Sequence, residues 1–350
     1  MTNLATQQDQ MVLLTGDEIV DILSGREVET VQIVQAAYQI HSLGDSELPH
    51  STFLRFPNRE RERIIALTAY LGGDFQVAGL KWIASFPDNI HQGIERASAT
   101  LILNDMRNGR PKAILESSVI SAKRTAAGAA LAADKLLEDK PLLKAGIIGC
   151  GLINFETFQF LMSLRPELQT LLVYDVDQGR AEQYKRKCQE LAPHVKILLM
   201  PEMESILAQA DVVALATTAV KPHIQDLSMC SPDTVILHTS LRDISADAIL
   251  AADNVVDDID HCCRAQTSVH LAEQQSGDRT FIRATIGDIL LGKARAKERG
   301  KPVVYSAFGL GILDIALGEY VYQRALEHQA GTRIGSFFPA SWLEREISNS

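Results

Sequence analysis

The chain has 350 residues, of which 46% are hydrophobic and 22% are charged. This composition excludes an intrinsically disordered or low-complexity protein, and the length is sufficient for two domains. The formal net charge is -10, from 44 acidic and 34 basic residues. Such an acidic balance argues against nucleic acid as the main partner, although a few cations gathered in one cleft would still bind a small anion.

The five cysteines are scattered along the chain, and none has C-x-x-C spacing. An odd, scattered set is typical of free thiols in a reducing cytosol. We interpret the segment His261-Cys262-Cys263 as structural. Adjacent cysteines on one strand would point to opposite faces and could hardly ligate the same ion, so no metal is expected.

The sequence predicts neither a targeting segment nor a membrane span. The opening residues, MTNLATQQDQ, lack the basic flank and apolar centre of a signal peptide. No apolar run approaches the roughly 20 residues that are needed to cross a bilayer. We therefore expect a soluble, cytoplasmic protein without a membrane partner.

The N-terminal third predicts two helices followed by a sheet. Thr15 and Glu18 have capping-box spacing and open a short helix, and a second amphipathic helix covers 29–43. From Pro49 to about Leu115, short runs rich in Ile, Leu and Val are separated by turn-forming segments such as PNRE and GGD. This pattern indicates an antiparallel or mixed sheet.

The remaining two thirds predict a helical bridge and a parallel sheet. The alanine-rich segment 117–137, with serines at its start, predicts a helix that joins the two halves. From Leu143 onward strands and helices alternate, which indicates a parallel sheet covered on both faces. The expected strands are 144–149, 170–175, 195–199, 211–217, 234–240, 254–258 and 302–308. A last helix covers 312–329, and the tail from Ala330 has no pattern that places it.

A strand, a glycine turn and a helix start follow one another in KAGIIGCGLINFETFQFL. Gly149 allows the tight turn, and Gly151 lets backbone N–H groups approach a pyrophosphate at the helix N-terminus. Leu152 and Ile153 begin this helix and belong to the expected cofactor site. The third position of G-x-G-x-x-G holds Asn154, so the dinucleotide fingerprint is incomplete.

A second strand ends at Asp175, 24 residues after Gly151, where a carboxylate would bind a ribose 2′-hydroxyl and repel a 2′-phosphate. The sequence therefore favours NAD over NADP, although Arg180 leaves NADP open. Thr217 and Thr218 end a later strand on the side where cofactors lie in such sheets. Their alternative role is to cap the next turn, and a doubly wound domain without nucleotide also remains open.

Several motifs together resemble one family. GLKW in a sheet, RTAA on a helix, IIGCGL, the isolated acid of HTSLRD, and GLGILD follow in this order. They resemble the ornithine cyclodeaminase/mu-crystallin family over roughly residues 50–330, and GGDFQVAGLKWIASFPDN is similar to its 2,3-diaminopropionate branch. The resemblance implies an α/β fold. It implies a Rossmann-type parallel-sheet NAD domain at 126–317 and an α+β substrate-binding and dimerisation domain at 1–125 and 318–350.

The same resemblance implies the site and the reaction. Lys81, Arg124 and Arg55 would line a cleft for a small, amino-acid-derived substrate, with Asp243 facing the nicotinamide and Gly309 close to the cofactor. Lys81 and Asp243 would be the catalytic residues. The implied reaction is NAD-dependent oxidation of N-(2-amino-2-carboxyethyl)-L-glutamate at the glutamate Cα, in siderophore or peptide-antibiotic biosynthesis. Asp243 would accept a proton and position water, and hydrolysis of the imine would release 2-oxoglutarate and L-2,3-diaminopropionate. The sheets of two copies would join in a homodimer.

Fixed cations suit this substrate, because it carries three carboxylates and two amines. The same residues also have simpler interpretations. Lys81 could be a charge on an edge strand that points into water. Arg124 and Lys123 could be a solvated surface pair, and Asp243 could cap the turn that follows it.

Other functions remain open at this point. An ornithine cyclodeaminase, an imine reductase and an alanine dehydrogenase are alternatives within the family, and a mu-crystallin-like protein would hold a nucleotide without turnover. The ISAD segment after Asp243 differs from the Pro-Gly-Lys stretch expected in the cyclodeaminase branch. Gly309, followed by Asp314 in a first helical turn, is also compatible with ordinary helix chemistry.

Overall fold

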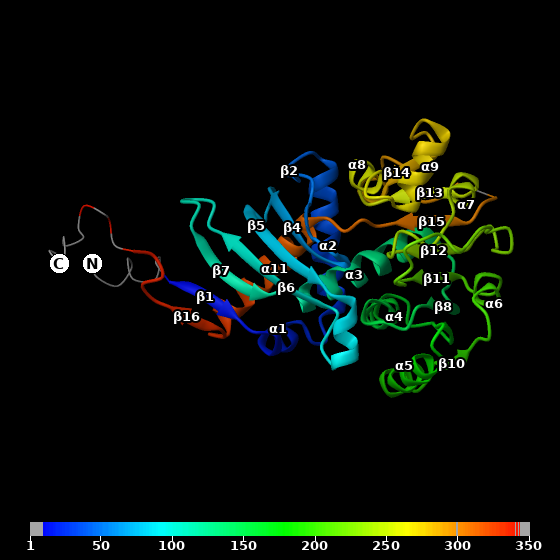
Figure 1. The fold of residues 1–350 in the computed structure, drawn as a ribbon, viewed down its shortest axis with the longest axis horizontal. Helices are drawn as coiled ribbons and strands as arrows, with labels where there is room; N and C mark the ends of the chain where they lie inside the picture. Colours follow the sequence, from blue (N-terminus) through cyan, green and yellow to red (C-terminus); the bar gives the residue numbers. More distant parts are fainter. Residues whose placement is uncertain (1–9, 299, 340, 342, 344–350) are drawn as a thin grey trace.

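The structure is a computed structural model, and it describes residues 10–298, 300–339, 341 and 343. Within these residues the strands form two eight-stranded sheets. We call them the mixed sheet and the parallel sheet, after the directions of their strands. Helix α3 lies between the two sheets, and α11 packs along the mixed sheet (Figure 1). The predicted α/β class is confirmed.

The mixed sheet has the strand order β16-β1-β7-β6-β5-β4-β2, with β3 paired to β4. β1 and β7 run parallel, and the other neighbours run antiparallel. β16 lies in the tail that the sequence did not place. The strands are β1 (Met11–Leu14), β2 (Ser46–Glu47), β3 (Thr52–Phe56), β4 (Arg59–Leu71), β5 (Val77–Ser85), β6 (Ala97–Asn104), β7 (Pro111–Glu116) and β16 (Thr332–Ile334).

The parallel sheet has the order β10-β9-β8-β11-β12-β15-β13-β14. Its strands are β8 (Lys144–Ile148), β9 (Thr170–Tyr174), β10 (Lys196–Leu199), β11 (Val212–Leu215), β12 (Val235–His238), β13 (Asp253–Val256), β14 (Ile282–Thr285) and β15 (Val303–Ser306). They agree with the predicted strands, apart from β14. This edge strand, IRAT, carries Arg and Thr at two of its four positions and is too polar to produce a strand pattern.

Helices cover both sheets. They are α1 (Gly16–Leu23), α2 (Glu27–Ser42), the 3-10 helix η1 (Pro87–Gln92), α3 (Ser118–Leu137), α4 (Leu152–Leu164), α5 (Gln178–Leu191), α6 (Glu204–Leu207), α7 (Ala246–Ala251), α8 (Ile259–Cys262), α9 (Ser268–Ser276), α10 (Ile286–Leu290) and α11 (Gly311–Glu327). The predicted capping box of α1 is present, since the Thr15 amide donates to the Glu18 carboxylate at 2.9 Å. All five cysteines are free and buried.

The paired cysteines require one correction. Cys262 ends helix α8 and Cys263 is its C-cap, so the interpretation that placed both on a strand was wrong. In residues 10–298 and the described residues after them, no group of three or more His, Cys, Asp or Glu side chains is arranged to hold a metal ion.

A continuous hydrophobic core connects the two halves through α3. It contains Leu101 of the mixed sheet, Val212 of the parallel sheet and the alanines of α3 between them. Small alanine side chains let α3 approach its neighbours closely, so the helix is buried along most of its length. The predicted domain boundaries at 125/126 and 317/318 fall inside α3 and α11, and that division stays a prediction.

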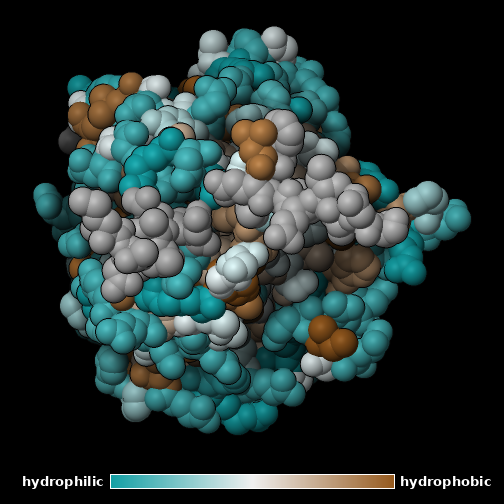
Figure 2. Space-filling view, turned by 90° about the vertical axis from the view of Figure 1, so that its left-hand side faces the viewer, coloured by the Kyte–Doolittle hydropathy of each residue, from teal (hydrophilic) through white to brown (hydrophobic). Residues whose placement is uncertain are grey.

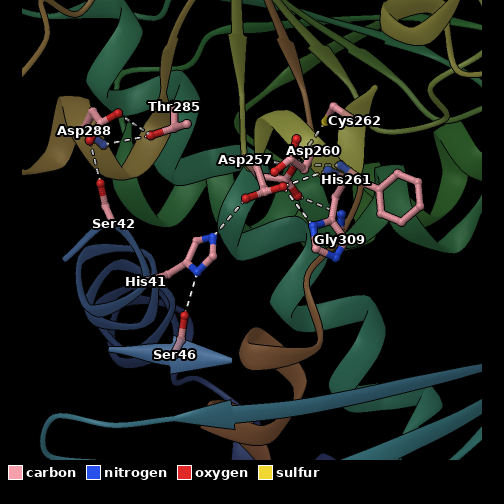
Figure 3. Close-up of polar contacts among 12 residues, drawn as sticks. His41, Ser42, Ser46, Asp257, Asp260, His261, Cys262, Thr285, Asp288 and Gly309 are labelled. Carbon is pink, nitrogen blue, oxygen red and sulfur yellow. Dashed lines mark hydrogen bonds and ion pairs between the residues drawn. The ribbon is translucent and has the colours of Figure 1, made fainter. Parts of the chain in front are cut away.

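Polar contacts fix α2 against the loops of the parallel sheet (Figure 3). The ring nitrogens of His41 lie 2.7 Å from the Ser46 hydroxyl and 3.2 Å from the Asp258 carboxylate. The next residue, Ser42, donates to Asp288 at 2.6 Å. These contacts join the two halves.

The surface at the end that carries β1 and β16 is mostly hydrophilic, with separate hydrophobic patches (Figure 2). Over the part of the chain that the structure describes, no helix has the length and apolar character needed to cross a bilayer. The apolar residues are gathered instead in the core around α3.

Candidate active site

Lys81 lies in the interior of the mixed sheet. Its strand, β5, is flanked by β4 and β6, where Leu67 and Leu101 are its partners. The residue is only 2% exposed. Its Nζ lies 2.7 Å from Asp314 Oδ2 and donates to Ser121 Oγ at 3.2 Å. The edge-strand interpretation of this lysine was therefore wrong.

Asp314 connects Lys81 to Arg124. This acid, on α11, is fully buried, and Arg124 Nε on α3 donates to its Oδ1 at 3.0 Å. Arg124 is itself buried, and the neighbouring Lys123 pairs with Glu156 at 3.0 Å. The solvated-pair interpretation was therefore wrong, because both cations lie inside the protein and pair with different acids.

The Lys81–Asp314–Arg124 cluster carries two cations and one anion. Burial, followed by the charge of Arg124, lowers the pKa of Lys81 to about 8 against the opposing effect of Asp314. The lysine is thus still mainly protonated at neutral pH. With one positive charge in excess, the cluster is suited to binding a carboxylate.

Gly309 lies directly against the guanidinium of Arg124. Its φ is +90°, and a Cβ at this position would lie 2.8 Å from Arg124 Nη1. The Gly309 and Phe308 amides donate to the Asp257 carboxylate at 2.7 and 2.9 Å (Figure 3). Burial raises the pKa of Asp257, and these two donors oppose the rise. Asp257 therefore fixes the turn after β15, and a glycine is required where the turn meets Arg124.

Asp243 is fully buried beyond the end of β12. Its carboxylate accepts hydrogen bonds from the hydroxyls of Thr217 and Ser240, and His238 Nε2 lies 3.3 Å away. Burial alone would raise the pKa of Asp243, but these hydrogen bonds and the charge of His238 lower it to about 2. The side-chain cap of α7 is Ser245, so the capping interpretation of Asp243 was wrong.

Asp243 is therefore an ionised, firmly held carboxylate at neutral pH. Two histidines extend its contacts, and sequence reasoning identified neither. His223 Nε2 is 3.9 Å from Asp243 Oδ1, and its side chain is exposed, so it leads from the buried acid to solvent. His238 Nδ1 lies 3.3 Å from Ser306 Oγ at the end of β15, shortly before the Gly309 turn.

The predicted site residues thus form two groups. Lys81, Arg124 and Gly309 lie together around Asp314, and Asp243 lies with Thr217. Asp243 of one group and Gly309 of the other lie in the segments that follow the adjacent strands β12 and β15. Thr217 also accepts from the Ala219 amide at 3.1 Å, as its capping role predicts, and Thr218 follows it at the same strand end.

The glycine turn has the geometry of a dinucleotide site. Gly149 has a φ of +94°, and a Cβ there would lie 2.5 Å from the Ala216 carbonyl oxygen. Gly151 begins α4, where a Cβ would meet no protein atom within 4 Å. Asn154 replaces the third glycine: its buried amide donates to the carbonyls of Ile148 and Gly149 at 3.0 and 2.7 Å. The fingerprint is incomplete because this amide holds the turn.

The acid expected at the ribose lies beside this turn. Asp175 follows β9, and its carboxylate accepts from the Cys150 amide at 2.7 Å. Arg180 Nε donates to the Cys150 carbonyl at 3.0 Å. Leu152, which is half exposed, and Ile153 form the first turn of α4. An open helix N-terminus with a carboxylate at its side fits the pyrophosphate and ribose of NAD.

Sequence reasoning missed Asp314 as a site residue. The signal was its position within the apolar run ILDIAL, because an acid in such a run is rarely buried without a partner. Arg55, which was predicted, lies apart from both groups. It is exposed on β3 opposite Arg63, in a cluster with Arg96 and Arg242 that the sequence did not reveal.

Comparisons with known proteins agree with this geometry. The model of the ornithine cyclodeaminase/mu-crystallin family matches residues 10–329. The N-((2S)-2-amino-2-carboxyethyl)-L-glutamate dehydrogenase of Staphylococcus aureus is 27% identical over 335 residues, which cover 94% of this chain and 99% of the relative.

Two solved structures share the fold over nearly the whole chain. An archaeal alanine dehydrogenase dimer with bound NAD has a TM-score of 0.82 and 25% identity, and the match covers 94% of this chain and all of that one (100%). The Thermococcus litoralis Delta(1)-pyrroline-2-carboxylate reductase, in complex with NADH and L-proline, has a TM-score of 0.85 and 23% identity, with coverages of 93% and 100%. The predicted Rossmann-type architecture is confirmed.

Proposed function

The chain belongs to the ornithine cyclodeaminase/mu-crystallin family, and from this premise we propose that it oxidises N-(2-amino-2-carboxyethyl)-L-glutamate with NAD. The products would be L-2,3-diaminopropionate and 2-oxoglutarate. The protein is an NAD-dependent oxidoreductase for an amino-acid-like substrate. The finer choice of substrate is supported by the Staphylococcus aureus relative, and we propose that the product enters siderophore or peptide-antibiotic biosynthesis in the cytoplasm.

The observation that carries the proposal is the Lys81–Asp314–Arg124 cluster. Its two buried cations share one acid beside the Gly309 turn, so a carboxylate of the substrate would supply the missing negative charge. A hydrogen bond to a charged group contributes about 1.5–3 kcal/mol, and two such bonds would be enough to orient the glutamate Cα.

We assign the cofactor to the glycine turn and to the loops that follow neighbouring strands. The proposed cofactor residues are Gly149, Gly151, Leu152, Ile153, Asp175, Thr217, Thr218 and Gly309. Bound NAD would supply a hydride acceptor for the glutamate Cα.

The protein's own residues would position the substrate and move its protons. Lys81, Arg124 and Arg55 would hold carboxylates, and Asp243 would orient the attacking water through its fixed charge. Because its pKa is about 2, Asp243 would hold a proton only briefly, and His223 offers the route from it to solvent.

A substrate comparison tests the assignment. The protein is incubated with NAD and, in turn, with N-(2-amino-2-carboxyethyl)-L-glutamate, ornithine or alanine, while NADH and products are followed. NADH together with L-2,3-diaminopropionate supports the proposal. Proline from ornithine without net NADH would indicate a cyclodeaminase, and pyruvate from alanine would indicate an alanine dehydrogenase. NAD binding without turnover of any substrate would indicate a nucleotide-binding protein.

We also propose that the protein is a homodimer. Leu54 and Trp82 are 44% and 43% exposed on the face of the mixed sheet opposite to Lys81. A second copy would cover this apolar face, and the archaeal alanine dehydrogenase neighbour is a dimer. Light scattering of the purified protein tests the proposal, since a monomeric mass would exclude it.

A further inference from the structure

A row of cationic side chains crosses one end of the mixed sheet. Arg55 on β3 lies directly opposite Arg63 on β4, and Arg63 lies opposite Ser85 on β5. Arg96, which precedes β6, donates from Nη1 to the Ser85 hydroxyl at 2.9 Å. Directly paired residues of neighbouring strands project from the same face of a sheet. The three arginines therefore gather on a single face around Ser85.

A fourth arginine reaches this row from the parallel half. Arg242 immediately precedes Asp243, and its Nη2 donates to the Ala265 carbonyl at 2.8 Å. Burial lowers the pKa of Arg63, and the charges of the other three arginines lower it further. Burial likewise lowers the pKa of Arg242, followed by the charge of Arg55, while Asp243 acts against both. The charge of Arg242 therefore acts on the row of arginines, and its neighbour in the chain is the proposed catalytic acid.

This cluster has too little negative charge of its own. Within the residues that the structure describes, none of the four arginines forms an ion pair with a carboxylate. Glu95 and Asp243 act on Arg96 and Arg242 only over longer distances. Like charges held together in partly buried positions are unfavourable unless a bound anion compensates them.

The cluster lies on the same face as Lys81. Lys81 and Ser85 are four residues apart on β5, and alternate residues of a strand share a face. Their Cα atoms are about 13 Å apart, at roughly 3.3 Å per residue. In the proposed substrate, a six-atom chain joins the two terminal carboxyl groups, and their carbons lie roughly 9 Å apart when it is extended, with bonds of about 1.5 Å. The separation of the Cα atoms exceeds the length of the substrate, but the long lysine and arginine side chains would reach inward and span the remaining distance.

We propose that Arg63, Arg96 and Arg242 form a second anion subsite, which binds the side-chain carboxylate of the substrate's glutamate part while Lys81 and Arg124 bind the opposite end. The inference rests on the proposed function for the identity of this substrate. It also gives a basis for specificity. Alanine has no second carboxylate, and the side-chain amine of ornithine would be repelled by the arginines.

The test uses Arg63→Gln and Arg96→Gln, with Arg61→Gln as the matched control. Arg61 is on the same strand as Arg63, but it is exposed and paired with Asp88 at 3.0 Å. For N-(2-amino-2-carboxyethyl)-L-glutamate, kcat/KM should fall about 10–100-fold in the two subsite variants and stay unchanged in the control. A second substrate is the analogue whose glutamate side chain ends in an amide. The wild-type protein should already have a low kcat/KM for this analogue, and the two subsite variants should lower it little further.

Two results would overturn the subsite: unchanged kinetics in Arg63→Gln and Arg96→Gln, or equal losses with the acid and the amide substrates. Thermal unfolding of each variant checks that it is folded. If the wild-type protein does not oxidise the substrate at all, the proposed function fails, and the subsite is tested alone by calorimetric titration with propane-1,2,3-tricarboxylate. Binding that is lost in Arg63→Gln and kept in Arg61→Gln would support the subsite without the function. Absent binding, or equal binding by both variants, would overturn it.

Discussion

Two clusters of cationic side chains differ in the source of their counter-charge. We call Lys81 and Arg124 the deep cluster, and Arg63, Arg96 and Arg242 the shallow cluster. Lys81 and Arg124 are deeply buried and share Asp314, which belongs to the fold. Arg63 and Arg242 are only partly buried, and in the described structure no carboxylate pairs with them. A fully buried charge needs a permanent partner, whereas water can screen a shallower one until a ligand arrives. A buried charge that pairs with an acid of the protein therefore stabilises the fold, whereas a partly buried charge without such an acid is available to bind a ligand.

The largest effect is expected at Asp243, the acid next to the shallow cluster. Asp243→Asn keeps the size of the side chain but removes its charge, so it should lower kcat by about 10²–10⁴-fold. NAD binding should change much less than kcat, because Asp243 contacts only Thr217 among the proposed cofactor residues and none of the glycine turn. Steady-state kinetics and an NADH fluorescence titration measure the two quantities. Near-normal turnover of this variant would refute the catalytic assignment.

The deep cluster should depend on Asp314 for stability. Asp314→Asn would leave two buried cations without their shared acid, and it should lower the free energy of unfolding by about 3–5 kcal/mol. Urea unfolding at neutral pH measures this change. In a Lys81→Met background the same substitution should cost less, because one cation has been removed. A loss below about 1 kcal/mol in both backgrounds would mean that the cluster does not need its acid.

The sequence could predict the local features of the site, but not the clusters that form between distant segments. Local patterns located the glycine turn, Asp175 and most strands, because hydrophobic periodicity and turn residues lie within a few positions of each other. The arginine cluster gave no such signal, since Arg63, Arg96 and Arg242 come from three separate segments. The register of β4 and β5, together with the hydrogen bond from Arg96 to Ser85, brings the first two to one face. The buried role of Asp314 likewise depends on the packing of α11 against β5.

The pKa of Lys81 allows the binding role of the deep cluster to be tested by changing the pH. The ammonium group is charged below its pKa of about 8 and neutral above it, so carboxylate binding should weaken as pH rises through this value. We expect kcat/KM to decline above about pH 8, by about 10–100-fold in total if one charge-assisted hydrogen bond is lost. Lys81→Arg is the matched variant, because a guanidinium keeps its charge throughout this range, and its profile should stay flat. A kcat/KM that rises above pH 8 would instead show that neutral Lys81 acts as a base.

The smallest predicted effect comes from giving the shallow cluster an acid of its own. Ser85 lies between Arg63 and Arg96, so Ser85→Asp would make this cluster resemble the one around Asp314. The free energy of unfolding should rise by up to about 1–2 kcal/mol, because hydrogen bonds to charged groups are stabilising. The KM for the substrate should rise about tenfold, since the new carboxylate occupies the place of the ligand. Ser163→Asp is the matched control, because Ser163 is exposed on α4 and belongs to neither sheet. If both variants change KM equally, the effect comes from net charge alone, and the arginines do not form an anion-binding subsite.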